Sequence, residues 1–146
     1  SPMPFNILLW RVIAVDEDGY YEGVVSVFDR GQLVLRKRPS DYSLATALQD
    51  HWPVQRLRWF TNGYFSITAS DNDIVMTDIR IGALGRHPFS FKVGKIENGS
   101  VKPVKAERMP TGHYNAEDLR WVFKRITDET VEIKRGNTLN GTNKVE

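Results

Sequence analysis

The sequence predicts an α+β fold, with a mostly antiparallel β-sheet and helices packed on one face of it. Three observations predict this fold. Runs of β-branched and aromatic residues occur near the start and in the middle of the chain, residues suited to tight turns join these runs, and segments with helical spacing lie in the middle and at the end. Strands joined by short turns pair antiparallel, and helices gathered outside the strand runs are typical of α+β architecture.

Length and composition are those of one globular domain. The chain has 146 residues, of which 40% are apolar and 26% charged, which is enough to bury a core. We expect residues 1–130 to form a single soluble domain and residues 131–146, which lack apolar periodicity, to form a frayed or disordered tail. No stretch reaches the roughly 20 apolar residues that cross a bilayer.

The first element is a β-hairpin in "NILLWRVIAVDEDGYYEGVVSVFD" (residues 6–29). Two strand-like runs flank Asp18 and Gly19, a pair suited to a type I′ turn in which both central residues have positive φ. A two-residue loop at that point predicts three facing pairs, which are Val15 with Glu22, Ile13 with Val24, and Arg11 with Ser26. A weaker third strand is expected in "LVLRKR" (residues 33–38).

Two short helices follow. Residues 40–52 have apolar residues at helical spacing, with Ser40 or Ser43 as the N-cap. Pro53 ends this helix and begins a second one, which ends at Asn62 and Gly63, residues able to form a left-handed C-cap. A strand is the alternative for residues 53–63, because apolar residues also alternate there.

A second hairpin is expected in residues 64–82, with its turn at Asp71, Asn72 and Asp73. Its second strand includes "MTDIRIG" (residues 76–82), which places Asp78 and Arg80 on the same side of the sheet. The segment "FSFKVGKI" continues the sheet as far as a turn at residues 98–99.

The last element is an amphipathic helix over residues 115–126, capped by Asn115. Its buried stripe is predicted to consist of Leu119, Val122, Phe123 and Ile126.

No pattern in the sequence predicts a metal site or a catalytic centre. The chain has no cysteine, and His51, His87 and His113 lack metal-ligand spacing. The acidic residues near positions 16–18 and 71–73 fit turns better than a calcium loop. The sequence also lacks a G-x-S-x-G nucleophile motif and a phosphate-binding loop. We therefore expect no metal and no cofactor in this domain.

Nucleic acid is disfavoured as a partner. The clusters at residues 36–38 and 56–60 mix cations with aromatic residues, as proteins that bind single strands do. However, 20 basic residues against 18 acidic ones leave a small charge surplus with which to contact phosphates.

Four charged residues, Arg11, Glu22, Asp78 and Arg80, lie within apolar β-runs, where an unpaired buried charge is costly. We favour a structural role for them, in ion pairs or facing solvent. The alternative is a polar floor in a cradle that binds a carboxylate- or phosphate-bearing ligand. The aromatic residues expected to line that cradle are Trp10, Tyr20, Tyr21 and Trp59.

Five short motifs carry a resemblance to a known family. "NILLWR", "DGYYEG", "RLRWF" followed by "NG", "TDIRIG" and "FSFKV" occur in order between about residues 4 and 95. In order and spacing they resemble the C-terminal soluble region of the membrane-bound metal-dependent hydrolase family, the YdjM-like proteins. The resemblance implies a membrane-associated parent whose N-terminal transmembrane region is a partner of this domain and holds the metal and catalytic residues. The positions it marks for shared structure or binding are Trp10, Arg11, Tyr21, Glu22, Trp59, Asp78 and Arg80.

The leading hypothesis is a soluble accessory domain of such a membrane-bound hydrolase, which binds a partner or a small anionic ligand without performing chemistry. The first alternative is an enzyme domain in which Glu22 and Asp78 form an acid/base pair assisted by Arg11 or Arg80. The second alternative is a weak nucleic-acid-binding module. The side of the membrane and the ligand are left open.

Overall fold

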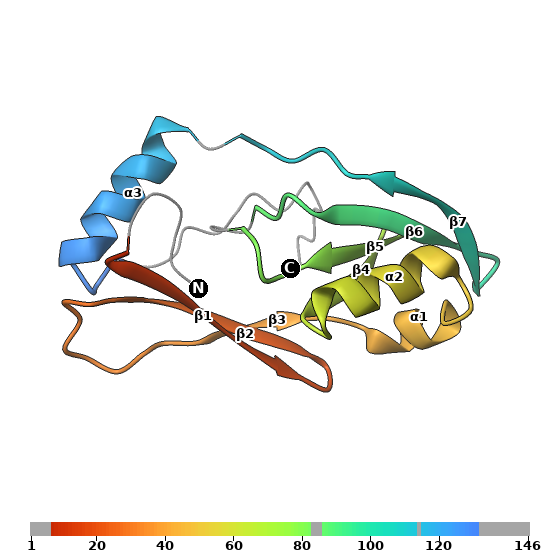
Figure 1. Cartoon of the computed structure of the whole chain (residues 1–146), viewed down its shortest axis with the longest axis horizontal. Coiled ribbons are helices and arrows are strands. Elements are labelled where there is room, and N and C mark those ends of the chain that lie inside the picture. Colours follow the sequence, from red (N-terminus) through yellow and green to blue (C-terminus); the bar gives the residue numbers. More distant parts are fainter. Residues whose placement is uncertain (1–6, 83–85, 114, 132–146) are drawn as a thin grey trace, which may run out of the picture.

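The computed structural model describes residues 7–82, 86–113 and 115–131 of the chain. These residues form a three-stranded and a four-stranded antiparallel sheet with three helices (Figure 1). The predicted α+β class is confirmed, although the strands form two sheets where the sequence suggested one. The molecule is elongated, with α3 at one end and α1 and α2 at the other.

Sheet 1 contains β1 (Leu9–Asp16), β2 (Gly19–Ser26) and β3 (Arg36–Pro39), in that order. The first hairpin is present, but its predicted register is wrong by two residues, because the loop is residues 17–18 and Arg11 faces Val24. Gly19 belongs to β2, where an added Cβ would lie 2.2 Å from the carbonyl oxygen of Arg38 in β3. This glycine therefore permits the close approach of a third strand.

Sheet 2 contains β4 (Phe65–Ser70), β5 (Asp73–Asp78), β6 (Ser90–Glu97) and β7 (Ser100–Arg108), in that order. Its outer hairpins have the turns that the sequence predicts. Asp71 and Asn72 have φ of 50° and 66°, and Asn98 and Gly99 have 50° and 73°, as type I′ turns require. The sequence predicted that the second strand of this hairpin continues to residue 82, but β5 ends at Asp78.

Helices α1 (Tyr42–Ala47) and α2 (Trp52–Thr61) pack on one face of sheet 2. The N-cap of α1 is Asp41, whose side chain accepts a hydrogen bond from the Ser43 backbone, so neither predicted serine caps the helix. The second helix is confirmed, with Asn62 as its left-handed C-cap. The core between helices and sheet consists of nine buried residues, Leu44, Ala45, Leu48, Val54, Phe65, Ile67, Ile74, Met76 and Val93.

Helix α3 (Ala116–Thr127) packs on sheet 1, where a smaller core consists of Leu9, Val24, Trp121, Val122 and Ile126. The predicted Asn115 cap is confirmed as a capping box with Asp118. The predicted stripe is half wrong, because Leu119 and Phe123 are exposed.

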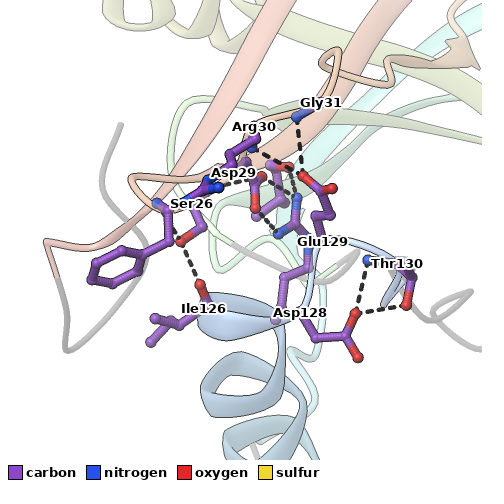
Figure 2. A network of polar contacts seen from close by, with 11 residues as sticks. Ser26, Asp29, Arg30, Gly31, Ile126, Asp128, Glu129 and Thr130 are labelled. Carbon is purple, nitrogen blue, oxygen red and sulfur yellow. Dashed lines mark hydrogen bonds and ion pairs between the residues drawn. The ribbon is translucent and has the colours of Figure 1, made fainter.

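A polar network explains why α3 buries a different face from the predicted one. This network joins the β2–β3 connection to the end of α3 (Figure 2). Buried Arg125 donates to both carboxylate oxygens of Asp29, at 2.8 and 2.6 Å, and to the Val24 carbonyl at 2.8 Å. These hydrogen bonds hold the pKa of Asp29 below its usual value. Nearby, one Glu129 oxygen accepts from the backbone N–H groups of residues 30 and 31 at 3.0 Å each. Apart from residue 131, the predicted tail lies outside the described residues.

Candidate functional site

Arg11 of β1 and Glu22 of β2 form a buried cluster where the two sheets meet. Arg11 is only 4% exposed, and it donates to one oxygen of Glu22 from Nε at 3.2 Å and from Nη2 at 2.7 Å. Its Nη1 donates to the Ile79 carbonyl, beyond the end of β5, at 2.6 Å. Arg38 in β3 binds the other Glu22 oxygen at 3.1 Å. Two guanidinium groups therefore hold a single carboxylate.

The environment of Glu22 keeps it ionised. Burial by itself would raise the pKa of this carboxyl, but the hydrogen bonds and charges of Arg11 and Arg38 outweigh burial and lower it. Neighbouring Tyr20 responds in the opposite direction, since burial and then the Glu22 charge raise its pKa to about 12. A general acid needs a pKa close to the working pH, so Glu22 is poorly suited to that role.

Asp78 and Arg80 form the pair that the sequence suggested, although the geometry is that of a turn. The Asp78 side chain is fully buried, and its Oδ1 accepts from the Arg80 backbone N–H at 2.9 Å and from Nε at 3.1 Å. Its Oδ2 accepts from Arg80 Nη2 at 2.7 Å. Asp78 therefore fixes the direction of the Arg80 side chain, which is one-third exposed.

The four predicted charged residues form two ion pairs, Arg11 with Glu22 and Asp78 with Arg80, and Arg11 binds the carbonyl of Ile79, which lies between Asp78 and Arg80 in the chain. Both carboxylates are enclosed, with side-chain exposures of 4% for Glu22 and 0% for Asp78. Three cavities of about 270 to 350 Å³ in the described part of the chain are lined by other residues. This arrangement favours structural ion pairs and gives the acid/base alternative no exposed carboxylate oxygen.

The outer face of α2 presents large aromatic side chains to solvent. Trp52, Arg56, Trp59 and Phe60 are all exposed, with Trp52 and Trp59 at 65% and 76%. At 100° per residue these four positions fall within an arc of about 100° on one side of the helix. The opposite side of the helix buries Val54 and Thr61. We call Trp52, Arg56, Trp59 and Phe60, together with Arg80, the α2 face.

Cation–π contacts order the α2 face. The Arg56 guanidinium lies 5.6 Å from the ring centre of Trp52 and 6.0 Å from that of Trp59. The Arg80 guanidinium lies 5.0 Å from the ring centre of Phe60. Arg56 thus contacts two exposed rings and Arg80 contacts one. The buried Asp78 carboxylate holds Arg80 in place. The α2 face is the candidate functional site.

The other predicted site residues lie elsewhere. Trp10 is half-exposed near the start of β1, at the α3 end of the molecule, and its Nε1 donates to the Ile7 carbonyl at 2.8 Å. Tyr21 lies in β2 below Lys37, whose ammonium is 5.6 Å from the ring centre. The aromatic residues of the predicted cradle are therefore spread over β1, β2 and α2.

Two of the cations considered for nucleic acid are engaged within sheet 1. Lys37 pairs with Asp18 at 2.6 Å, and Arg38 pairs with Glu22. Of the sequence clusters, only residues 56–60 reach the candidate site. The sequence had drawn attention to that cluster, but Trp52 was not among the predicted site residues.

Two of the three histidines, His51 and His87, contact backbone carbonyls. His51 Nε2 lies 2.8 Å from the Val104 carbonyl, and His87 Nδ1 lies 3.1 Å from the Ile81 carbonyl. Burial, and then the charge of Arg11, lower the pKa of His87. Across the described ranges no group of three or more His, Cys, Asp or Glu residues could hold a metal ion.

No helix within the described ranges is long and apolar enough to cross a bilayer. Comparison of the chain with protein-family models, curated proteins and solved structures found no match.

Proposed function

We propose that the chain is an accessory binding domain of a membrane-bound protein and that the α2 face is its binding surface. The observation that carries this proposal is the exposed ladder of Trp52, Arg56 and Trp59. Exposed apolar patches of this kind mark interaction sites, and Trp and Arg are the residues most enriched among those that dominate binding energy.

The second support is the way that two sequence motifs meet. "RLRWF" supplies Arg56, Trp59 and Phe60, and "TDIRIG" supplies Asp78 and Arg80. The Arg80–Phe60 contact joins the motifs at the surface, while Asp78 is used entirely in holding Arg80. A buried carboxylate that orients a partly exposed arginine is typical of a preorganised binding site.

The membrane-bound parent is supported by the motif resemblance alone. In that arrangement the buried Arg11, Glu22 and Asp78 stabilise the domain, while catalysis belongs to a part of the parent that this chain does not contain. A binding surface without chemistry is consistent with two enclosed carboxylates and an exposed aromatic helix face.

The test uses the full-length parent in its own membrane. We would compare the parent lacking this region, the double variant Trp52→Ala/Trp59→Ala, and the matched control Trp10→Ala, a half-exposed tryptophan of β1 that is not part of the α2 face. We expect the double variant to reproduce the loss of membrane-associated activity caused by the deletion, and the control to retain activity.

The outcomes separate the two parts of the proposal. Full activity of the parent that lacks this region would overturn the accessory role. If the deletion lowers the activity of the parent but the double variant does not, the α2 face is not the binding surface.

A further inference from the structure

We infer that the α2 face docks on the headgroup layer of an anionic lipid bilayer. This inference rests on the proposed function for the choice of surface and adds the identity of the partner. The first observation that supports it is the shape of the α2 face. The aromatic rings and Arg56 project from one arc of a convex helix, and the described cavities near α2 open elsewhere, beside Arg58 and Gly63. A ridge whose large side chains share one side can touch a flat partner with all of them together.

The aromatic residues have the chemistry of a membrane interface. Trp52 and Trp59 each combine a large apolar ring with a polar N–H group, and such residues concentrate at the headgroup level of bilayers. Spaced seven residues apart on one helix, they are separated by about 10 Å along its axis. Phe60 adds a third ring on the same arc. Helices that lie in the interface bury a face of this kind at the boundary between headgroups and acyl chains.

The charge of this part of the chain matches an anionic surface. Residues 51–70 contain no Asp or Glu, although the whole chain has 18. Within this stretch, Arg56 lies between the two indole rings, where its guanidinium would meet lipid phosphates at the depth of the rings. Arg80 beside Phe60 pairs with Asp78, so Arg56 supplies the net positive charge of the α2 face. Each arginine near an anionic bilayer strengthens attraction, while a carboxylate would oppose it.

A bilayer fits these observations better than a nucleic acid strand. Single-strand binders combine stacking rings with a groove of cations that follows the phosphates. The cations at residues 37 and 38 pair with Asp18 and Glu22 in sheet 1, so they do not extend the α2 face into such a groove.

The experiment measures co-sedimentation of the 146-residue chain with vesicles. One set is pure phosphatidylcholine, and the other is an equal mixture of phosphatidylcholine and phosphatidylglycerol. We expect binding to the mixed vesicles, weakened by added salt, with a blue shift of tryptophan fluorescence. Trp52→Ala/Trp59→Ala should lower the partition coefficient more than about tenfold.

A matched pair of arginine variants controls for net charge. Arg56→Gln should weaken binding roughly fivefold, from the loss of one cation at an anionic surface. Arg58→Gln removes the same charge from the same helix, but it lies about 160° around the helix from Arg56, so we expect little change. Trp10→Ala is the corresponding tryptophan control. Circular dichroism of every variant verifies that the fold is retained.

The remaining outcomes overturn the inference in distinguishable ways. Equal losses in Arg56→Gln and Arg58→Gln would show non-specific attraction and overturn docking through the α2 face. Absence of vesicle binding, combined with binding to a single-stranded oligonucleotide that Trp52→Ala/Trp59→Ala abolishes, would replace the bilayer by nucleic acid. If vesicles are not bound but the same double variant inactivates the parent, the bilayer inference fails and the proposed function stands.

Discussion

The two halves of the molecule are stabilised by different means. Sheet 2 with α1 and α2 encloses nine buried core residues. Sheet 1 with α3 encloses five, and it adds two buried ion pairs, Arg11–Glu22 and Arg125–Asp29. Buried ion pairs contribute little net stability compared with apolar packing. Removing one partner is nevertheless strongly destabilising, because the other charge stays buried without its partner. Sheet 2 also has such a pair, Asp78–Arg80 at the end of β5, whose arginine is one-third exposed. The sheet 1 half therefore depends more on ionisation, and the sheet 2 half depends more on shape.

The largest effect is expected from breaking the inter-sheet cluster. Arg11→Met leaves Glu22 with Arg38 alone and leaves the Ile79 carbonyl without this donor. We expect the free energy of unfolding in urea to fall by about 3–5 kcal/mol. The control Arg120→Met, at an exposed position of α3, should change it by less than about 0.5 kcal/mol. A loss below about 1 kcal/mol for Arg11→Met would show that the cluster is dispensable.

A cavity in the sheet 2 core should cost slightly less. Ile67 is fully buried in this core, and Ile67→Ala should lower the free energy of unfolding by about 3 kcal/mol through lost burial and a residual cavity. The contrast lies in pH. The Ile67→Ala loss should stay constant as the pH falls below 4.5, whereas the Arg11→Met loss should shrink because protonated Glu22 no longer needs a cation. Parallel behaviour of the two variants would erase the distinction between the halves.

The acid response of the unmodified chain should show two steps. The folded pKa values of His87, Glu22 and Asp29 all lie below their ordinary values of 6.5, 4.5 and 3.8. In each case the unfolded chain binds the proton first as the pH falls, so stability present at neutral pH is lost, beginning below 6.5 and continuing below 4.5. His87→Gln should remove the first step and keep the second. Urea midpoints measured against pH test this, and identical profiles would refute the assignment to His87.

The smallest effect is expected from an exposed pair in the same sheet. Lys37 and Asp18 are in contact at 2.6 Å, yet both side chains are largely in water. Asp18→Asn should leave the melting temperature unchanged within error, since solvent-exposed pairs contribute little. A clear drop would mean that burial does not separate the important ion pairs of sheet 1 from the unimportant ones.

Local chemistry was the part of the fold that sequence reasoning could predict. Four asparagines occupy the turn or helix cap that the neighbouring sequence predicts, namely Asn72, Asn98, Asn62 and Asn115. These positions are predictable because a turn or a cap is determined by residues that are close together in the sequence. Gly19 misled the register because its role is to accommodate β3, whose Arg38 lies 19 residues later in the chain.

Partners distant in sequence explain the remaining misses. The buried face of α3 includes Arg125, which reads as a surface residue until Asp29 is placed beside it. Strand β7 was missed because it is a mostly exposed edge strand that contains Pro103.

The candidate site was half visible in the sequence. The Asp78–Arg80 pair could be anticipated from their spacing, although the end of β5 converts it from a strand pair into a turn. The α2 face was predicted only in part, since Trp59 and the cluster at residues 56–60 were singled out in the sequence, whereas Trp52 was given no role. Only the packing of Val54 and Thr61 against sheet 2 reveals that α2 turns its largest side chains outward.

The junction between the two sheets is made largely to backbone oxygens. Arg11 reaches the carbonyl of Ile79, the Tyr42 hydroxyl lies 3.3 and 3.2 Å from the carbonyls of Gly19 and Phe65, and Ser40 bonds both ways with the backbone of Ile67. A carbonyl is the same whatever side chain its residue carries. The sheets should therefore keep their mutual alignment through many substitutions at the accepting positions, whereas inserting or deleting one residue between positions 67 and 79 would shift the Ile79 carbonyl relative to the Ile67 carbonyl, so that both could not keep their donors.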